Sequence, residues 1–287
     1  MTVPDLAGRV ALVTGASRRA GIGAAVAARL LADGARVLVH SWSPHDAGQP
    51  HGADPAGPGA VLDGLGGPGP HLDHVELDLA RPDSPAALVE HTIERFGALD
   101  LLVVNHAHSS DQDLAALTAA ELDLAWAVNT RAPLLLAQAY AARHDDTRPD
   151  GRILLFTSGQ HLGPMPSELP YIATKGALHQ LTASLADALA DRGITVNCLN
   201  PGPVDTGYAP PPAHQQVARA FPRGRWTSPD EIAELVSWLV GPHSRLITGQ
   251  VVNAEAGFRR HLERLPLINA PTAGPEGVSD PVRPGSP

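Results

Sequence analysis

The chain has 287 residues, of which 43% are hydrophobic, and this is enough for one large domain or two small ones with a sizeable core. Its net charge of −9, without any run of lysine or arginine, argues against nucleic acid or an anionic membrane as a partner. A single cysteine, Cys198, rules out an internal disulfide and fits a reducing compartment. The N-terminal residues lack the pattern of a signal peptide, so we expect a cytoplasmic protein.

Short β-branched runs alternate along the chain with longer Ala/Leu-rich segments of helical period. Strands are expected at residues 9–13, 36–40, 74–78, 101–105, 152–156, 195–199 and 250–253. Helices are expected at residues 22–33, 84–96, 118–142, 171–191 and 228–240. This alternation predicts an α/β fold, a single doubly wound parallel sheet (a Rossmann fold) with helices on both faces, whose ligands bind at the carboxyl ends of the strands.

The first expected strand runs through a glycine turn into a helix, in the stretch "RVALVTGASRRAGIGAA". Gly15 would allow the tight turn, Gly21 would let the backbone approach a pyrophosphate, and Gly23 would let helix and strand pack closely. The start of the helix would then offer free N–H groups to the phosphates. The stretch predicts nucleotide binding, although glycine turns also occur as plain connections.

The end of the second strand bears on which cofactor is used. An acidic residue there normally accepts the ribose hydroxyls of NAD and repels a 2′-phosphate. Ser41 stands at about this position, whereas Arg18 and Arg19 in the turn could bind a phosphate. NADP(H) is therefore favoured over NAD(H), unless both arginines simply point into water.

Residues 41–72 carry six prolines and eight glycines where such a fold usually has a short helix. Only residues 60–65 could keep a helical turn in this irregular insertion. Its four potential ligands suggest a metal site, but the irregular backbone offers nothing to orient them, and we expect no metal. These ligands are His45, Asp46, His51 and Asp54.

Tyr171 and Lys175 lie four residues apart at the start of an expected helix, so their side chains would be adjacent. Ser158 ends a buried strand at the edge where ligands bind. Reduction of a carbonyl needs a proton donor and a polarising group, and a nearby ammonium would lower the pKa of the tyrosine from about 10 toward neutrality. Lys175 is the only lysine in the chain, which argues against the alternative of an ordinary exposed residue.

These motifs, in this order, resemble the short-chain dehydrogenase/reductase family over roughly residues 6–260. The glycine motif reads "TGASRRAGIG", two residues longer than the usual form, and "NHAH" is similar to the NNAG segment of the family. By this resemblance the catalytic residues would be Ser158, Tyr171, Lys175 and Asn129. The cofactor contacts would be Gly15, Ser17, Arg18, Arg19, Gly21, Ile22, Gly23, Ser41, Asp78, Leu79, Asn105, Ala107, Tyr171, Lys175, Pro201, Gly202, Val204 and Thr206.

The resemblance also implies roles. Tyr171 would be the general acid/base, Lys175 would lower its pKa and hold the nicotinamide ribose, and Ser158 would orient the substrate oxygen. Asn129 would anchor a water-linked proton relay. Three residues depart from the family pattern: His108 and Ala256 replace glycines, and Glu255 stands where Asp is common. His106, His108 and His161 are expected to be solvated or hydrogen-bonded rather than catalytic.

The preferred function is an NADP(H)-dependent oxidoreductase that interconverts a carbonyl and a secondary alcohol. The sequence looks most like the 3-oxoacyl-carrier-protein reductase-like branch, so a thioester ketoreductase is the alternative; a non-catalytic nucleotide sensor is a third. Asp187 would repel an acidic carrier protein, and the proline-rich residues 208–226 would set substrate selectivity. We expect one catalytic domain over residues 1–262, a disordered tail over 263–287, and a homo-oligomer, a tetramer by resemblance or a dimer.

Overall fold

The structure is a computed structural model that describes residues 5–57, 59–148 and 150–260. The predicted tail at 263–287 lies outside the described residues. Seven parallel strands form one sheet in the order β3-β2-β1-β4-β5-β6-β7. The strands are β1 (Val10–Thr14), β2 (Arg36–Ser41), β3 (Leu72–Glu76), β4 (Leu101–Val104), β5 (Arg152–Phe156), β6 (Thr195–Asn200) and β7 (Val251–Asn253). The predicted doubly wound sheet is confirmed.

The central strands are apolar along their whole length because helices cover both faces of the sheet. Every residue of β1, β4, β5 and β6 is buried. The third strand begins two residues earlier than predicted, since Leu72 pairs with Val37 of β2. Asp78 therefore follows β3 instead of ending it.

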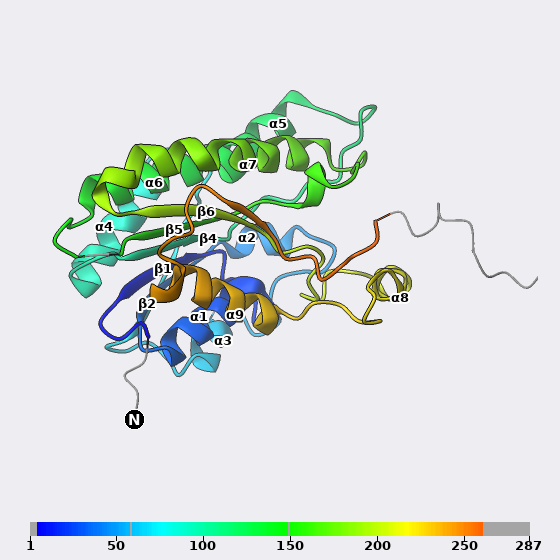
Figure 1. Cartoon of the computed structure of the whole chain (residues 1–287). Coiled ribbons are helices and arrows are strands. Elements are labelled where there is room, and N and C mark those ends of the chain that lie inside the picture. Colours follow the sequence, from blue (N-terminus) through cyan, green and yellow to red (C-terminus); the bar gives the residue numbers. More distant parts are fainter. Residues whose placement is uncertain (1–4, 58, 149, 261–287) are drawn as a thin grey trace, which may run out of the picture.

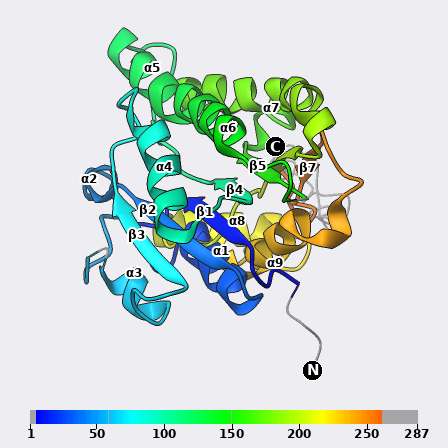
Figure 2. The same ribbon diagram turned by 90° about the vertical axis from the view of Figure 1, so that its left-hand side faces the viewer.

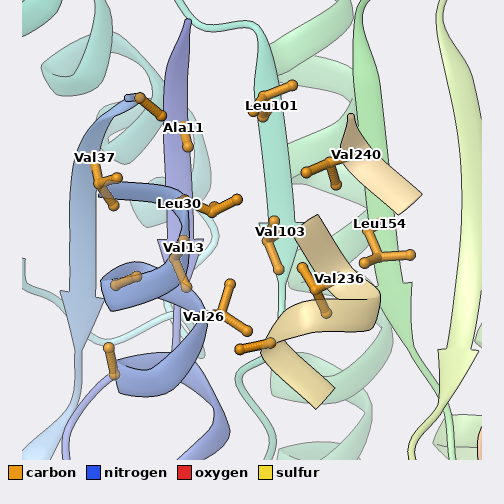
Figure 3. Close-up of a cluster of buried hydrophobic side chains, with 14 of the residues drawn as sticks. Ala11, Val13, Val26, Leu30, Val37, Leu101, Val103, Leu154, Val236 and Val240 are labelled. Atoms are coloured by element: carbon orange, nitrogen blue, oxygen red, sulfur yellow. The ribbon is translucent and has the colours of Figure 1, made fainter. Parts of the chain in front are cut away.

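Two layers of helices enclose the sheet (Figures 1 and 2). One face is covered by α4 (Ser84–Phe96), α6 (Ala132–Arg143) and α7 (Leu169–Leu189), and the other by α1 (Ile22–Ala32) and α9 (Pro229–Val240). Figure 3 shows the core between the sheet and helices α1 and α9, where Val26 and Leu30 of α1 and Val236 of α9 pack against the valines and leucines of the sheet. These packed faces fix the strand ends that carry the site.

The ends of two helices follow from their sequence. Gly97 adopts a left-handed φ of 81° and stops α4, with its N–H donating to Ile93 O at 2.7 Å. Helix α9 begins with a capping box, in which Ser228 Oγ accepts from the N–H of Glu231 and the carboxylate of Glu231 accepts from the N–H of Ser228.

The prediction of a single helix at 118–142 is wrong in one respect. It is divided into α5 (Ala119–Trp126), a π-helical segment over Ala127–Arg131, and α6. The N–H of Ala132 donates to Ala127 O, five residues back, and Pro133 has no N–H to continue a regular ladder. The carbonyl of Val128 is thus left free for a partner outside the helix.

The insertion between β2 and β3 contains two short helices. Helix α3 (Gly59–Gly64) agrees with the turn predicted at 60–65, but α2 (Ser43–Ala47) was not predicted. Residues 208–226 contain α8 (Pro211–Ala220), which projects from the body of the molecule in Figure 1. The described residues also contain short 3₁₀ turns at Gly159–His161, Ala190–Arg192 and Pro242–Ser244. Among the helices described, none is long and apolar enough to cross a membrane.

Candidate active site

A cavity of about 430 Å³ opens at the carboxyl ends of β1, β2 and β4. Strand β1 has β2 on one side and β4 on the other, so this is the point where the order of the sheet reverses and where such folds bind ligands. Seven of the predicted cofactor contacts line the cavity: Gly15, Ser17, Arg18, Asp78, Leu79, Asn105 and Ala107.

The glycine turn packs as the sequence predicted. A Cβ on Gly15, whose φ is 76°, would lie 2.7 Å from His106 Cα, and one on Gly23 would lie 2.3 Å from Gly15 O. Asn105 Nδ2 donates to Gly15 O at 3.0 Å and ties the turn to β4. Gly21 caps α1 without a side chain, so the N–H groups of its first turn remain for an anion. The residues present thus fit the pyrophosphate of a dinucleotide.

Two buried histidines hold this turn in place, and sequence reasoning gave them no such role. His106 Nε2 faces Val128 O at 3.0 Å, so it carries the proton, and Nδ1 accepts from Thr14 Oγ1 at 2.8 Å. The carbonyl of Val128, which accepts this hydrogen bond from His106, is the one that the π-helical segment leaves without a partner in the helix. Burial lowers the pKa of His106 well below its usual value, which keeps the ring neutral as this bonding requires.

His40 acts in the same way from β2. Its Nε2 faces Leu77 O at 2.7 Å, and its Nδ1 lies 3.4 Å from the N–H of Gly15. Burial lowers the pKa of His40 to about 4. Both imidazoles are therefore neutral, and their hydrogen bonds hold the glycine turn in place beside the cavity.

Ser41, Arg18 and Arg19 were predicted to distinguish NADP from NAD at the ribose 2′ position. In the structure these side chains have different partners. Ser41 is buried, with Oγ 2.7 Å from His74 Nε2, and lies outside the cavity lining, whereas its neighbour Trp42 is part of it. Arg18 lines the cavity and donates to Thr206 O at 2.9 Å. At the end of β2, Trp42 therefore lines the cavity in place of Ser41.

Arg19 turns to the insertion instead. Its Nε and Nη2 each donate to the carboxylate of Asp54 at 2.9 Å, and its backbone N–H donates to the same group at 3.1 Å. These hydrogen bonds lower the pKa of Asp54, whose side chain is only 6% exposed. Arg19 lies outside the cavity lining, so this pair ties the insertion to the glycine turn.

Ser158, Tyr171 and Lys175 come together at the edge of β5. Lys175 is buried, and its Nζ donates to Phe156 O at 2.9 Å and lies 5.7 Å from the centre of the Tyr171 ring. Thr157 Oγ1 donates to Lys175 O at 2.8 Å, which fixes helix α7 against the strand end. The spacing in the sequence predicted this arrangement.

The electrostatics of this group differ from the expectation. Burial raises the pKa of Tyr171 and the carboxylate of Glu168 adds to this, while a hydrogen bond with Ser158 acts in the opposite direction. Lys175 does not contribute the expected lowering of the Tyr171 pKa. Burial disfavours the ammonium and lowers the pKa of Lys175 itself to about 8. The chain alone therefore holds the phenol of Tyr171 in its protonated form.

Asn129 connects this group with the cavity. From the π-helical segment, its Oδ1 accepts from His108 N at 2.7 Å, and its Nδ2 donates to His108 O at 2.9 Å and to Thr174 Oγ1 at 3.1 Å. His108 lines the cavity and Thr174 precedes Lys175. One buried amide thus bonds both the cavity wall and the helix that carries Tyr171 and Lys175.

The segment after β6 lies beside the same edge. Gly202 has a φ of 64°, and a Cβ there would lie 3.0 Å from Glu255 Cα. Asn200 Oδ1 accepts from Gly202 N, and Asn200 Nδ2 donates to Glu255 at 2.8 Å. Several predicted cofactor contacts lie outside the lining of the described cavity: Ile22, Gly21, Gly23, Pro201, Gly202, Val204 and Thr206.

The insertion supplies residues that sequence reasoning missed. The dipeptide Ser43–Pro44 followed by Asp46 is a typical start of a helix, and this signal could have revealed α2. Of the three histidines expected to be bonded rather than catalytic, His106 and His108 make hydrogen bonds and His161 packs against His179. Within the part of the chain that the structure describes, no three His, Cys, Asp or Glu side chains gather so as to hold a metal ion.

Comparison with known proteins gives consistent matches over most of the chain. A family model described as "Enoyl-(Acyl carrier protein) reductase" matches residues 15–259. The chain is 34% identical to the uncharacterized oxidoreductase YjdA of Bacillus subtilis (strain 168), over 88% of this chain and 97% of that protein. A short chain dehydrogenase from Burkholderia cenocepacia J2315, solved in complex with NADP, is 33% identical, with a TM-score of 0.76 over 88% of this chain and 98% of that one. The angucycline C-6 ketoreductase LanV, solved with bound NADP, is 32% identical, with a TM-score of 0.76 over 88% and 96%.

Proposed function

Because the chain belongs to the short-chain dehydrogenase/reductase family, an oxidoreductase family dependent on NAD(P), we propose that it interconverts a carbonyl compound and a secondary alcohol. The observation that carries this proposal is the meeting of Tyr171, Lys175 and Ser158 after the end of β5, together with the bonds by which Asn129 connects helix α7 to His108 in the cavity lining. Burial keeps the phenol protonated, so it can donate a hydrogen bond to a carbonyl oxygen, and transfer of its proton requires a positive charge that favours the phenolate.

In this proposal each side chain has a separate task. Tyr171 gives its proton to the substrate oxygen and takes it back in the reverse direction, and Ser158 orients that oxygen. Lys175, buried beside the Tyr171 ring, would hold the nicotinamide ribose, and its ammonium would stabilise the phenolate once the cofactor is bound. Asn129 fixes His108 and Thr174 and so anchors the proton path at Lys175. The cofactor, when bound, supplies or accepts the hydride.

We propose NADP(H) as the preferred cofactor. NADP is bound in two similar solved structures, those of the Burkholderia dehydrogenase and of LanV. In this chain, Arg18 lines the cavity and no carboxylate ends β2. The glycine turn would hold the pyrophosphate, while Asp78 and Leu79, which line the cavity, would contact the adenine.

The test is a panel of ketones, aldehydes and thioesters followed by the absorbance of NADPH. The wild-type protein should reduce at least one class, and Tyr171→Phe should abolish this reduction. Tyr140→Phe is the matched control, because Tyr140 OH donates to Asp100 O in the core, away from the site. No turnover by the wild type, or equal turnover by Tyr171→Phe, would refute the proposal.

The second candidate is a ketoreductase for thioester-linked 3-oxoacyl groups, favoured by the carrier-protein wording of the matching family model. Asp187 lies exposed on α7 and would repel an acidic carrier protein. We therefore prefer a free substrate. Turnover of a thioester with measurable binding of a carrier protein would reverse this preference.

Three further features are part of the same proposal. Cys198 is buried and free, which fits a cytoplasmic location. The last strand ends at Asn253, which agrees with a catalytic domain that closes by residue 262. A homo-oligomer is supported by large apolar side chains that lie exposed on α5 and α9.

A further inference from the structure

Helix α2 forms one wall of the cavity. Pro44, His45, Asp46 and the following Gly48 all line it. The helix has only five residues and none of them is buried, so its own hydrogen bonds cannot keep it in place. Contacts with the rest of the molecule must hold α2 over the cavity.

The start of α2 is tied to the sheet edge by its backbone. The N–H of Trp42 donates to Ser17 Oγ at 3.1 Å, and the N–H of Ser43 donates to Glu76 Oε1 at 2.8 Å. The body of the helix is linked to the opposite wall by two imidazoles. His45 Nδ1 lies 3.3 Å from His108 Nδ1, and the ring centroids are 5.0 Å apart.

His108 is a firm anchor for this contact. Its backbone N–H and carbonyl both bond to the side-chain amide of Asn129, and its Nε2 lies 2.6 Å from Glu121 Oε1 of helix α5. The imidazole is therefore fixed from two sides, and its remaining nitrogen points to α2.

We propose that His108 is a positioning residue that latches helix α2 over the cavity through His45 and thereby slows the release of a bound nucleotide. This step rests on the proposed function in one respect, namely that the cavity binds NADP(H). The resemblance to the family gives glycine at position 108, which has no side chain to form this latch.

The latch depends on protonation. Since the carboxylate of Glu121 can only accept, Nε2 of His108 carries a proton, and the two Nδ1 atoms share one proton between them. A second proton between them would put two donors face to face and remove the hydrogen bond. The other charged groups that act on this pair are Asp46, His51 and Glu121, and Arg18 acts on His51.

The direction of the pH effect follows from His45. Burial, with a further contribution from His108, lowers the pKa of His45 from its usual value of 6.5, so the latched state favours the neutral ring. The latch is therefore fully formed above about pH 6.5 and weakens as the pH falls below it.

Amide hydrogen exchange tests the hold on α2 without any cofactor. The reporters are the N–H groups of Gly48 and Gln49, which donate to His45 O and Asp46 O. His45→Ala, His108→Ala and the double variant should all speed their exchange by about tenfold. Alanine favours helix, so faster exchange in His45→Ala reports the lost latch and not a weaker helix. His243→Ala, at an exposed position, is the control, and unchanged exchange in all variants would overturn the proposal.

Stopped-flow fluorescence of NADPH tests the consequence. Each single variant should raise the dissociation rate about tenfold, and the double variant should be no faster than either single one, since both remove the same contact. The wild-type rate should rise from about pH 8 to about pH 6, while that of the double variant should not. The latch is overturned if the rate increases of the two single variants multiply in the double variant. It is also overturned if all the proteins release NADPH at the same rate. A wild type that binds neither NADPH nor NADH would refute the proposed function instead, and the exchange measurement would still decide whether His108 holds α2.

Discussion

Lys175 is the only lysine among 21 basic residues, and its surroundings explain why arginine does not stand there. Lys175 is 2% exposed, and its ammonium donates to Phe156 O beside the Tyr171 ring. A guanidinium is planar and larger, and it cannot take the place of a compact ammonium at such a buried position.

Lys175→Arg should therefore lower turnover by about 10²–10⁴-fold, the usual contribution of a tuned acid/base group. Lys175→Met, which keeps the length without the charge, should lose a similar factor and guards against misfolding by the bulkier arginine. The measurement is kcat on any substrate that the panel identifies, with circular dichroism to check the fold. Wild-type kcat in either variant would contradict the role of the ammonium.

The same residue predicts a pH dependence. Burial lowers the pKa of Lys175 to about 8, so the ammonium is present at lower pH and is lost as the pH rises through this value. Reductase kcat/KM should fall above about pH 8 for this reason. Protein labelled with ¹⁵N-lysine would give one side-chain signal to titrate, since the chain has one lysine. A midpoint above about pH 10, the usual value, would show that burial has no such effect.

Cofactor preference can be assigned to single residues. Arg18 lines the cavity, whereas Arg19 is bound to Asp54, so Arg18→Ala should weaken binding of 2′,5′-ADP about tenfold or more and Arg19→Ala should change it little. Trp42→Asp, at the end of β2 that lines the cavity, should favour NADH. Ser41→Asp should destabilise the fold instead, because Ser41 is buried. Calorimetry with 2′,5′-ADP and 5′-AMP measures these differences, and equal losses for both arginines would contradict the assignment.

At the scale of elements, the strands could be predicted because a parallel sheet covered on both faces requires continuous apolar runs. The π-helical segment could not, since Pro133 in a pattern of helical period signals a disturbance but not its form. Helix α2 was missed because prolines and glycines dominate the insertion, and its position depends on distant partners such as His108. The elements that escaped prediction are those held by tertiary contacts.

The π-helical segment gives a prediction at this scale. Asn129→Asp keeps the acceptor for His108 N but removes the donors to His108 O and Thr174 Oγ1, which should cost about 1–3 kcal/mol of stability and lower kcat. Asn253→Asp is the control, because Asn253 Oδ1 only accepts, from Asn200 Nδ2. Thermal unfolding and turnover are the measurements, and equal effects of the two changes would show that the segment has no special role.

On the scale of the whole molecule, the candidate catalytic residues could be predicted from spacing, because Tyr171 and Lys175 share one helix and Ser158 closely follows the strand β5. The residues that form the cavity walls could not be predicted from spacing. His40 lies in β2, whereas His106 and His108 lie in the segment after β4, and only the folded chain brings these two segments together at one edge of the sheet. Local spacing thus predicts chemistry better than it predicts the shape of a site.

The outer surface of the molecule argues for association with further copies. Leu122 and Trp126 lie four residues apart on α5, so they share one helix face, and they are 37% and 49% exposed. Such neighbouring large apolar side chains typically mark an interface. We expect light scattering to give a mass that is a multiple of 29.9 kDa at micromolar concentration. Trp126→Glu should lower that mass, while Leu114→Glu, at a 79% exposed position outside the helices, should not. A wild-type mass of 29.9 kDa, or one that Trp126→Glu leaves unchanged, would show that α5 does not form the interface.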